Sequence, residues 1–204
     1  MTASSSTAAR KGARRGLPLS PWAMFFRGFL KHPVMVGSII PSSGKLIRKM
    51  LGPVDWKNTK LFVEYGPGVG TFCQTVLDHM EPDAQYIAID TNPDFIAYLR
   101  KNIRDSRFSA VHGSAADVVQ IVKDHGHDHA DYVLSGLPFS TLPPGVGDKI
   151  GAETARVLRV DGAFLVYQFS PKVHDFLAPQ FNDIDHAMEW WNVPPAQLYW
   201  AWKR

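Results

Sequence analysis

The chain contains one cysteine, no long apolar run and no acidic residue before Asp55. A single cysteine, Cys73, cannot form an internal disulfide, so we expect a reducing compartment such as the cytosol. A membrane-spanning helix needs about 20 consecutive apolar residues. The one candidate region is interrupted by four basic residues, Arg27, Lys31, Lys45 and Arg48. We therefore expect neither a fold stabilised by disulfide bonds nor a chain that crosses a bilayer.

The lack of acidic residues near the N-terminus makes the charge uneven. The first 54 residues carry nine basic side chains and no acidic one; the whole chain carries +3, so the remainder carries −6. A basic arm on an acidic body indicates a polyanionic partner, either nucleic acid or an anionic lipid surface. Residues 1–19 have little to bury and are expected to be a disordered arm, with a transit peptide as the alternative.

Residues 20–54 are expected to form N-terminal helices. Ser20 is a suitable N-cap and Pro21 suits the first helical position, so a helix is predicted to run to Lys31. A second short helix is predicted from residue 42 or 43 to Leu51. Bulky apolar side chains recur on one face of the first helix, with Arg27 and Lys31 away from it: Trp22, Phe25, Phe26, Phe29 and Leu30. This pattern is typical of a helix in a lipid interface, and an ordinary packed helix is the alternative.

The remainder, residues 55–204, alternates short apolar strands with helices, which predicts an α/β domain with a mostly parallel sheet. Strands are predicted at 61–64, 85–90, 108–112, 132–135 and 163–168, and helices at 71–79, 93–102, 116–123 and 146–158. After Lys172 we expect a short helix and a final pair of strands near 184–191 and 197–202. Tryptophans 190, 191, 200 and 202 are expected to be core residues of that pair.

The segment Val63-Glu64-Tyr65-Gly66-Pro67-Gly68-Val69-Gly70 follows an apolar strand and begins a helix. Backbone approaches a ligand closely at this position, and a side chain in place of glycine would block the approach. A dinucleotide site spaces its glycines Gly-x-Gly-x-x-Gly and places a pyrophosphate on the helix. Here the third glycine comes one residue earlier, and Glu64 would repel a pyrophosphate but favour a cationic amino acid. The pattern predicts S-adenosylmethionine as the cofactor.

Further residues are assigned to this cofactor. Asp90, at the end of the second strand, is expected to accept hydrogen bonds from the ribose hydroxyls. Ser114 and Ala115 are expected to hold the adenine edge. The complete predicted set is Ile40, Ser42, Glu64, Gly66, Pro67, Gly68, Gly70, Asp90, Thr91, Ser114, Ala115, Ser135 and Gly136. No metal site is expected, because the histidines at 125, 127 and 129 lie in a polar turn that is usually solvated.

The fourth strand ends in Ser135-Gly136-Leu137-Pro138-Phe139, which resembles the Asn-Leu-Pro-Tyr loop of amino methyltransferases such as the rRNA adenine dimethylases. In that loop a side-chain oxygen and a backbone carbonyl accept hydrogen bonds from the target amine. Gly136 stands at the position of the Asn, so the side chain that would hold the amino group of adenine is absent.

Together with Val36-Gly37-Ser38-Ile39-Ile40-Pro41-Ser42-Ser43, these motifs make residues 20–204 similar to bacterial phospholipid N-methyltransferases. The resemblance implies a class I, Rossmann-like methyltransferase fold with seven strands and an N-terminal amphipathic extension. It implies methylation of phosphatidylethanolamine to phosphatidylcholine, with S-adenosylhomocysteine as the other product. It also implies a peripheral enzyme on the cytoplasmic face of an anionic membrane. Neither a nucleic acid nor an obligate protein partner is expected.

Methyl transfer requires a neutral amine in line with the sulfonium methyl group, and an aromatic pocket or an acceptor can favour that form. The candidate catalytic residues are Tyr65, Ser135, Leu137, Phe139 and Tyr167. Alternatives are an RNA adenine or small-molecule methyltransferase, and a membrane-bound protein that keeps the fold without turnover.

Overall fold

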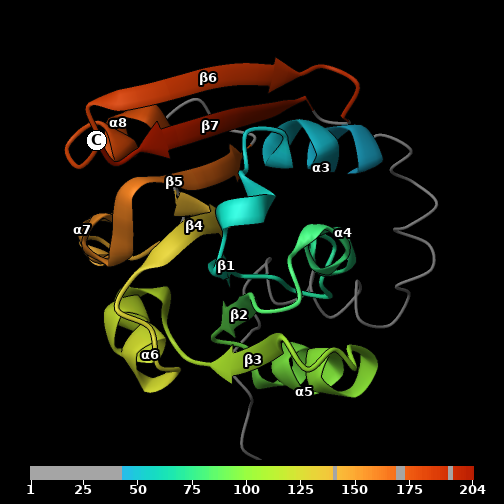
Figure 1. Ribbon diagram of the computed structural model, residues 1–204. Coiled ribbons are helices and arrows are strands. Elements are labelled where there is room, and N and C mark those ends of the chain that lie inside the picture. Colours follow the sequence, from blue (N-terminus) through green and yellow to red (C-terminus); the bar gives the residue numbers. More distant parts are fainter. Residues whose placement is uncertain (1–42, 140–141, 169–172, 193–194) are drawn as a thin grey trace, which may run out of the picture. The chain divides into compact units, whose positions relative to one another are not determined.

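The computed structural model describes residues 43–139, 142–168, 173–192 and 195–204. They form a seven-stranded sheet with helices on both faces (Figure 1). The predicted arm at 1–19 and the predicted helix at 21–31 lie outside these residues, as do Ile40 and Ser42.

The sheet has the strand order β3-β2-β1-β4-β5-β7-β6. Strands β1 to β5 pair in parallel, and β7 is antiparallel to both of its neighbours. The strands are β1 (Leu61–Tyr65), β2 (Gln85–Asp90), β3 (Phe108–His112), β4 (Ala130–Ser135), β5 (Leu158–Gln168), β6 (Asp183–Glu189) and β7 (Ala196–Trp202). This is the class I methyltransferase arrangement, so the predicted fold class is confirmed.

The helices connect these strands and cover the two faces. They are α3 (Ser43–Leu51), α4 (Cys73–His79), α5 (Pro93–Asn102), α6 (Val118–Asp124), α7 (Val146–Val157) and α8 (Val173–Leu177), with single 3-10 turns η1 (Trp56–Asn58) and η2 (Ala115–Asp117). Asn92 caps α5, since its side chain accepts a hydrogen bond from the Asp94 N–H, and Pro93 follows at the first helical position. Among the described residues, no helix has both the length and the apolar character that crossing a bilayer requires.

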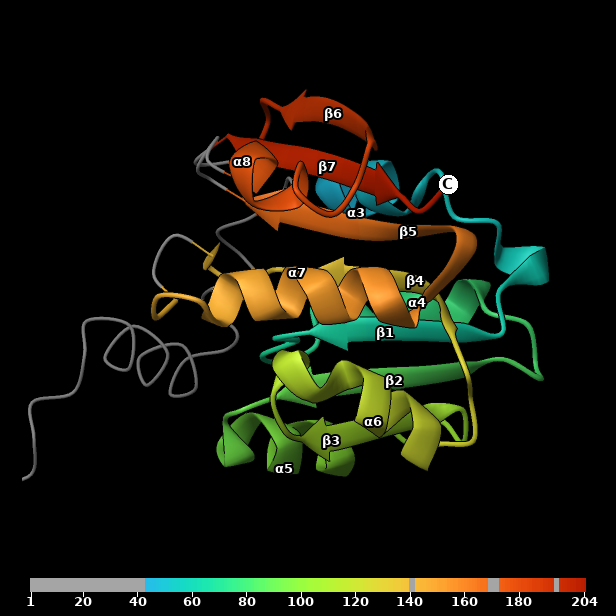
Figure 2. The ribbon, with the colours of Figure 1, turned by 90° about the vertical axis from the view of Figure 1, so that its left-hand side faces the viewer.

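The core has two halves, one on each face of the sheet, and successive side chains of β1 point alternately into one half and the other. Leu61, Val63 and Tyr65 pack with residues of η2, α6, α7 and α8, whereas Phe62 packs with residues of α3, α4 and α5. Figures 1 and 2 show these two groups of helices on opposite faces. Because both faces are covered, all five residues of β1 are buried, which explains its nearly continuous apolar sequence.

Helix α3 packs on the C-terminal part of the sheet. Its buried side chains Leu46, Ile47 and Met50 belong to the same core cluster as Leu198 of β7. The Trp200 indole N–H donates to the Met50 carbonyl at 2.8 Å, which fixes the end of the helix to β7. Residues 43–51 therefore contribute directly to the core of the methyltransferase sheet.

Strand β5 begins five residues earlier than predicted, at Leu158, and β4 begins two residues earlier, at Ala130. The start of β5 contains Arg159 and Asp161 and has two exposed residues, so it shows no continuous apolar run that would predict a strand. Gly162 permits the pairing, because a Cβ there would lie 2.6 Å from the Asp131 carbonyl oxygen. The helix predicted at 116–123 is divided into η2 and α6.

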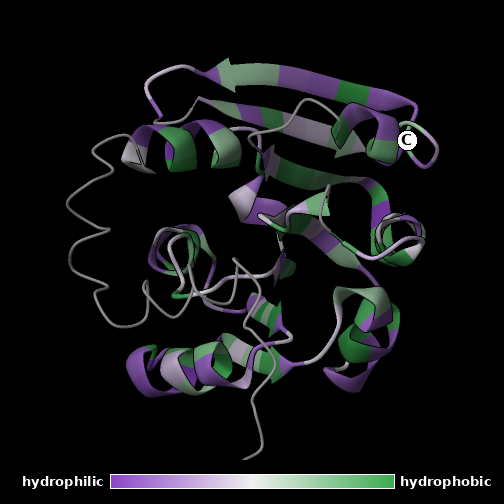
Figure 3. Ribbon diagram, turned by 180° about the vertical axis from the view of Figure 1, so that it is seen from behind, coloured by the Kyte–Doolittle hydropathy of each residue, from purple (hydrophilic) through white to green (hydrophobic). Residues whose placement is uncertain are grey.

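Strand β6 forms the edge of the sheet and contains both hydrophilic and hydrophobic residues (Figure 3). It ends at Glu189, so Trp190 and Trp191 lie in the turn beyond it and are 70% and 74% exposed. The prediction that they are core residues is therefore wrong, because they lie beyond the last paired residue of the strand. Trp200 is buried, and Trp202 is partly buried, as expected.

Candidate cofactor and active site

The glycine loop joins β1 to α4 at the carboxyl edge of the sheet. Gly66, Gly68 and Gly70 have φ values of +64°, +58° and +82°, a region that other residues rarely adopt. A Cβ on Gly70 would also lie 2.8 Å from Leu99 Cδ2. The third glycine is therefore required for its own conformation and for packing of the loop on α5.

Asp90 ends β2 and faces this loop. Its carboxylate accepts hydrogen bonds from the Asn92 N–H at 2.8 Å and the Gly68 N–H at 3.4 Å. Partial burial raises the pKa of Asp90, while these N–H groups lower it. The contacts hold the carboxylate at the mouth of the loop, where an acceptor for ribose hydroxyls is expected.

A cavity of about 110 Å³ lies at the carboxyl ends of β1, β2, β3 and β4. It brings together five of the predicted cofactor residues, Gly66, Asp90, Thr91, Ser114 and Ala115. Six further residues that were not predicted to bind the cofactor also line this cavity: Ile89, Gly113, Leu137, Leu142, Val146 and Ile150. Gly113 could have been identified from its place directly before Ser114, whereas the apolar residues carried no local signal that distinguishes them from core.

Glu64 lies on the opposite side of β1, in a buried polar cluster with α4 and β2. Its side chain accepts a short hydrogen bond from the Tyr86 hydroxyl, and the Cys73 thiol lies 3.7 Å from the same oxygen. Glu64 is only 1% exposed, and burial raises its pKa to about 7. Such a carboxyl group changes charge near neutral pH and becomes ionised more readily when a cation lies beside it.

The burial of Glu64 is expected to make stability depend on pH. Because its pKa rises from 4.5 to about 7 on folding, the protonated form stabilises the fold below pH 4.5 and this contribution is lost toward pH 7. The loss is on the order of 3 kcal/mol in the free energy of unfolding. Glu64→Gln should remove this part of the pH dependence in urea titrations between pH 4.5 and 8. The exposed control Glu81→Gln should keep it, and an unchanged profile for Glu64→Gln would contradict the assignment.

Gly136, in the loop after β4, is in close contact with Tyr167 of β5. A Cβ on Gly136 would lie 2.2 Å from the Tyr167 hydroxyl oxygen and 2.4 Å from its Cζ. Tyr167 therefore occupies the space next to residue 136 that a side chain would otherwise take. Its ring packs on Phe72, with centroids 5.1 Å apart. Burial raises the pKa of Tyr167, so its hydroxyl remains protonated at neutral pH and can form hydrogen bonds without acting as a base.

Two other polar groups of this loop already have partners. The Leu137 carbonyl accepts hydrogen bonds from the Phe139 N–H at 2.9 Å and from the Gln168 side chain. The Ser135 hydroxyl is buried and accepts a hydrogen bond from the Leu137 N–H at 3.2 Å. In this conformation both groups shape the loop, and the Leu137 carbonyl, predicted to accept from the substrate amine, has no lone pair left for it.

The Tyr65 side chain, also predicted to be catalytic, lies in the core beneath α7. Its hydroxyl is 3.0 Å from Thr154 Oγ1, which in turn donates to the Ile150 carbonyl at 2.7 Å. Tyr65 is fully buried. The structure thus separates it from Tyr167, which packs on the other face of the sheet, because residues 64 and 65 point to opposite faces of β1. Tyr65 shares its face with Phe139, and both rings contact Phe164.

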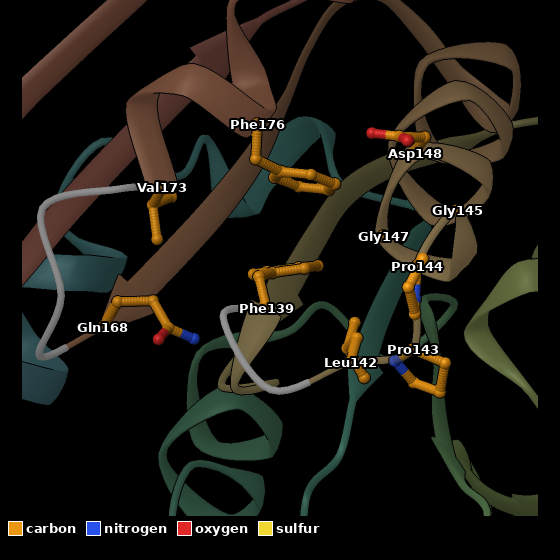
Figure 4. Close-up of a pocket in the computed structure, with 10 residues that line it drawn as sticks. All are labelled: Phe139, Leu142, Pro143, Pro144, Gly145, Gly147, Asp148, Gln168, Val173 and Phe176. Atoms are coloured by element: carbon orange, nitrogen blue, oxygen red, sulfur yellow. The ribbon is translucent and has the colours of Figure 1, made fainter.

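Phe139 lines a second pocket, of about 240 Å³, which adjoins the cofactor cavity through the shared residue Leu142. The Phe139 and Phe176 rings stack with centroids 4.1 Å apart. Figure 4 shows these rings between the side chains of Gln168 and Asp148. An aromatic pocket with one carboxylate favours a cationic or amine group.

Comparison with known proteins agrees with this geometry. Residues 62–162 match the family described as "Methyltransferase domain". An ornithine lipid N-methyltransferase of Singulisphaera acidiphila is 31% identical over 180 residues, covering 87% of this chain and 94% of that protein.

Solved structures share the fold at low sequence identity. A precorrin-6y C5,15-methyltransferase of Geobacter metallireducens superimposes with a TM-score of 0.63 at 15% identity, covering 78% of this chain and 88% of that one. A 16S rRNA methyltransferase of T. thermophilus, solved with S-adenosylmethionine and guanosine, gives 0.59 at 17% identity, covering 80% of this chain and 43% of that one. The chain therefore belongs to the class I S-adenosylmethionine-dependent methyltransferases, in the family that includes the ornithine lipid N-methyltransferase.

Proposed function

We propose that this enzyme transfers methyl groups from S-adenosylmethionine to the primary amine of a membrane lipid head group. The observation that carries the proposal is the aromatic pocket around Phe139, which adjoins the cofactor cavity and contains Asp148. The similarity to an ornithine lipid N-methyltransferase over 94% of that protein supports a lipid as the carrier of the amine.

The pocket suits the chemistry of amine methylation. S-adenosylmethionine supplies an electrophilic methyl group, and the amine must lose a proton to present its lone pair. The Asp148 carboxylate attracts the protonated amine, and the Phe139 and Phe176 rings provide an apolar wall that disfavours the charged form close to the cofactor. As methyl groups are added, a ring face that is not stacked on its neighbour can hold the more alkylated cation. The Tyr167 hydroxyl cannot accept the released proton, because it is already protonated at neutral pH. The proton passes to solvent at the exposed Asp148 side of the pocket.

Phosphatidylethanolamine is the substrate that we propose first, with phosphatidylcholine as the product of successive methylations. The motifs at residues 36–43, 63–70 and 135–139 support this choice. Ornithine lipid is the second candidate, and the identity to the Singulisphaera protein favours it. Both head groups contain a primary amine.

We further propose that the enzyme acts at the cytoplasmic face of an anionic membrane, attached through the basic, aromatic segment at residues 22–31. The charge distribution supports this arrangement, because a positive N-terminal region precedes an acidic body. RNA is disfavoured as a substrate, because Gly136 offers no side chain to hold an adenine amino group.

Label transfer from radioactive S-adenosylmethionine tests the proposed function. The purified chain is incubated separately with vesicles containing phosphatidylethanolamine, vesicles containing ornithine lipid, and total RNA. We expect label in the lipid fraction of the first arm, and label in the second arm alone would reassign the substrate to ornithine lipid. Label in RNA without label in either lipid would contradict lipid methylation.

A further inference from the structure

We propose that the turn after β6 and the outer side of α3 form a membrane-contact surface. We call it the edge patch, and it consists of Lys45, Lys49, Trp190 and Trp191. The partner is the surface of an anionic bilayer. This choice of partner rests on the proposed function, whereas the patch itself is defined by exposure and contacts alone.

The exposure of the two tryptophans is the first observation. Only three large hydrophobic side chains are exposed in the part of the chain that the structure describes: Val160, Trp190 and Trp191. Two of the three are adjacent residues in one turn. A single exposed apolar side chain needs no explanation, but two adjacent indoles present a large apolar surface to water. Trp is the residue type enriched at membrane–water interfaces, because its ring is apolar and its N–H is polar.

Two basic residues of α3, Lys45 and Lys49, contact this turn and the end of β6. The Lys45 ammonium lies 5.2 Å from the centroid of the Trp191 ring. Lys49 donates to the Met188 carbonyl at 2.6 Å and lies 3.9 Å from Glu189 Oε2, so the charge of Lys49 is partly balanced. Helix α3 also carries the exposed Arg48 and contains no acidic residue. Glu189 is buried, so the exposed face of the patch is positive and complementary to anionic lipid head groups.

Sheet topology places the patch at the same edge as the site. Strands β5 and β6 are both antiparallel to β7 and therefore run in the same direction (Figure 2). The turn after β6 thus lies at the carboxyl edge of the sheet, where β1, β2 and β4 also end, with β7, β5 and β4 between β6 and β1. The glycine loop, Asp90 and Gly136 follow strands at that same edge. Docking by this edge would turn the cofactor cavity and the Phe139 pocket toward the bilayer. A head-group amine could then reach them while its acyl chains remain in the membrane.

Vesicle co-sedimentation of the full-length chain tests the edge patch without any turnover. The vesicles contain phosphatidylglycerol and phosphatidylcholine, and neither substrate nor cofactor is added. For Trp190→Ala/Trp191→Ala, we expect the partition coefficient to fall on the order of tenfold or more, because two indoles no longer leave water. The matched control Val160→Ala removes an exposed apolar side chain at the start of β5, on the opposite edge, and should bind like the unmodified chain.

The charge of the patch is tested in the same assay. Lys45→Glu/Lys49→Glu should weaken binding to anionic vesicles, and the loss should shrink at high salt, where surface charges are screened. Lys123→Glu, an exposed substitution at the end of α6, is the control. Binding of the tryptophan variant at the level of the unmodified chain would overturn the proposal. A shift from dimer to monomer in that variant, with vesicle binding unchanged, would assign the patch to a second copy of the chain instead.

Activity separates this proposal from the proposed function. On a short-chain phosphatidylethanolamine supplied below its micelle concentration, the tryptophan variant should methylate at the unmodified rate, whereas on vesicles its rate should fall with binding. If no lipid is methylated by the unmodified chain, the proposed function fails, yet a tenfold loss of vesicle binding would still support the edge patch. Equal loss of activity on the short-chain and vesicle substrates would overturn a role confined to membrane docking.

Discussion

Replacing Asp90 with asparagine is expected to raise the dissociation constant of S-adenosylmethionine on the order of a hundredfold, because two charge-assisted hydrogen bonds to the ribose would be weakened. The carboxylate lines the cofactor cavity and is held in place by the N–H groups of Asn92 and Gly68. An amide is nearly isosteric with a carboxylate, but it carries no charge and offers only one acceptor oxygen. Isothermal titration with the cofactor measures the effect.

Asp94→Asn is the matched control. Asp94 is four residues away, exposed on the first turn of α5, and absent from the cavity wall. Its substitution should leave cofactor affinity within about twofold, since surface changes away from a site have small effects. Equal affinities for Asp90→Asn and the unmodified chain would mean that the ribose is bound elsewhere.

Gly136→Ala is expected to lower the turnover number on the order of a hundredfold while cofactor affinity changes little. The added methyl group would lie 2.2 Å from the Tyr167 hydroxyl oxygen, so the tyrosine ring or the loop must move. A displacement of about 1 Å beside the reacting groups is enough for an effect of this size. Steady-state kinetics with a saturating lipid substrate, together with cofactor titration, separate the two quantities.

Two variants show whether the effect of Gly136→Ala arises from the site. Gly44→Ala, in which the new Cβ has only an ordinary contact of 3.5 Å with Arg48, should retain full turnover. Tyr167→Phe removes the hydroxyl without moving the ring and reports the contribution of that group alone. Unchanged turnover in Gly136→Ala would show that the Gly136–Tyr167 contact does not shape the site.

The cofactor half of the site could be predicted from the sequence because its signals are local. The glycine loop, Asp90 and Ser114 each lie at the end of a strand, and the predicted bounds of β2, α5 and β3 coincide with those observed. Strand ends at one edge of a parallel sheet converge in space, so short motifs were enough to locate the cavity.

The substrate half depends on contacts between distant parts of the chain. Phe139 meets Phe176, and Gly136 meets Tyr167, across more than thirty residues. No local pattern indicates that Gln168 would reach the Leu137 carbonyl. Tyr65 is a different case, because strand alternation already places it opposite to Glu64. Its burial follows from the cover on both faces of the parallel sheet, and alternation assigns it to the face opposite to Glu64, so both could have been predicted.

The exposure of Trp190 and Trp191 depends on the residue at which the pairing of β6 with β7 ends. Trp190 and Trp191 have the residue type of a buried strand, and a strand two residues longer would have placed them in the sheet. The pairing of β6 with β7 stops at Glu189. Two presumed core residues thereby become the most exposed large hydrophobic side chains of the described chain.

Mass spectrometry of the lipid product is the most direct test of the account. The purified chain is incubated with S-adenosylmethionine that carries a deuterated methyl group and with vesicles containing phosphatidylethanolamine. We expect the head-group fragment to gain one to three deuterated methyl groups on its nitrogen, with an unchanged acyl-chain mass. Unlabelled head groups after incubation with both phosphatidylethanolamine and ornithine lipid, from a preparation that binds the cofactor, would contradict it.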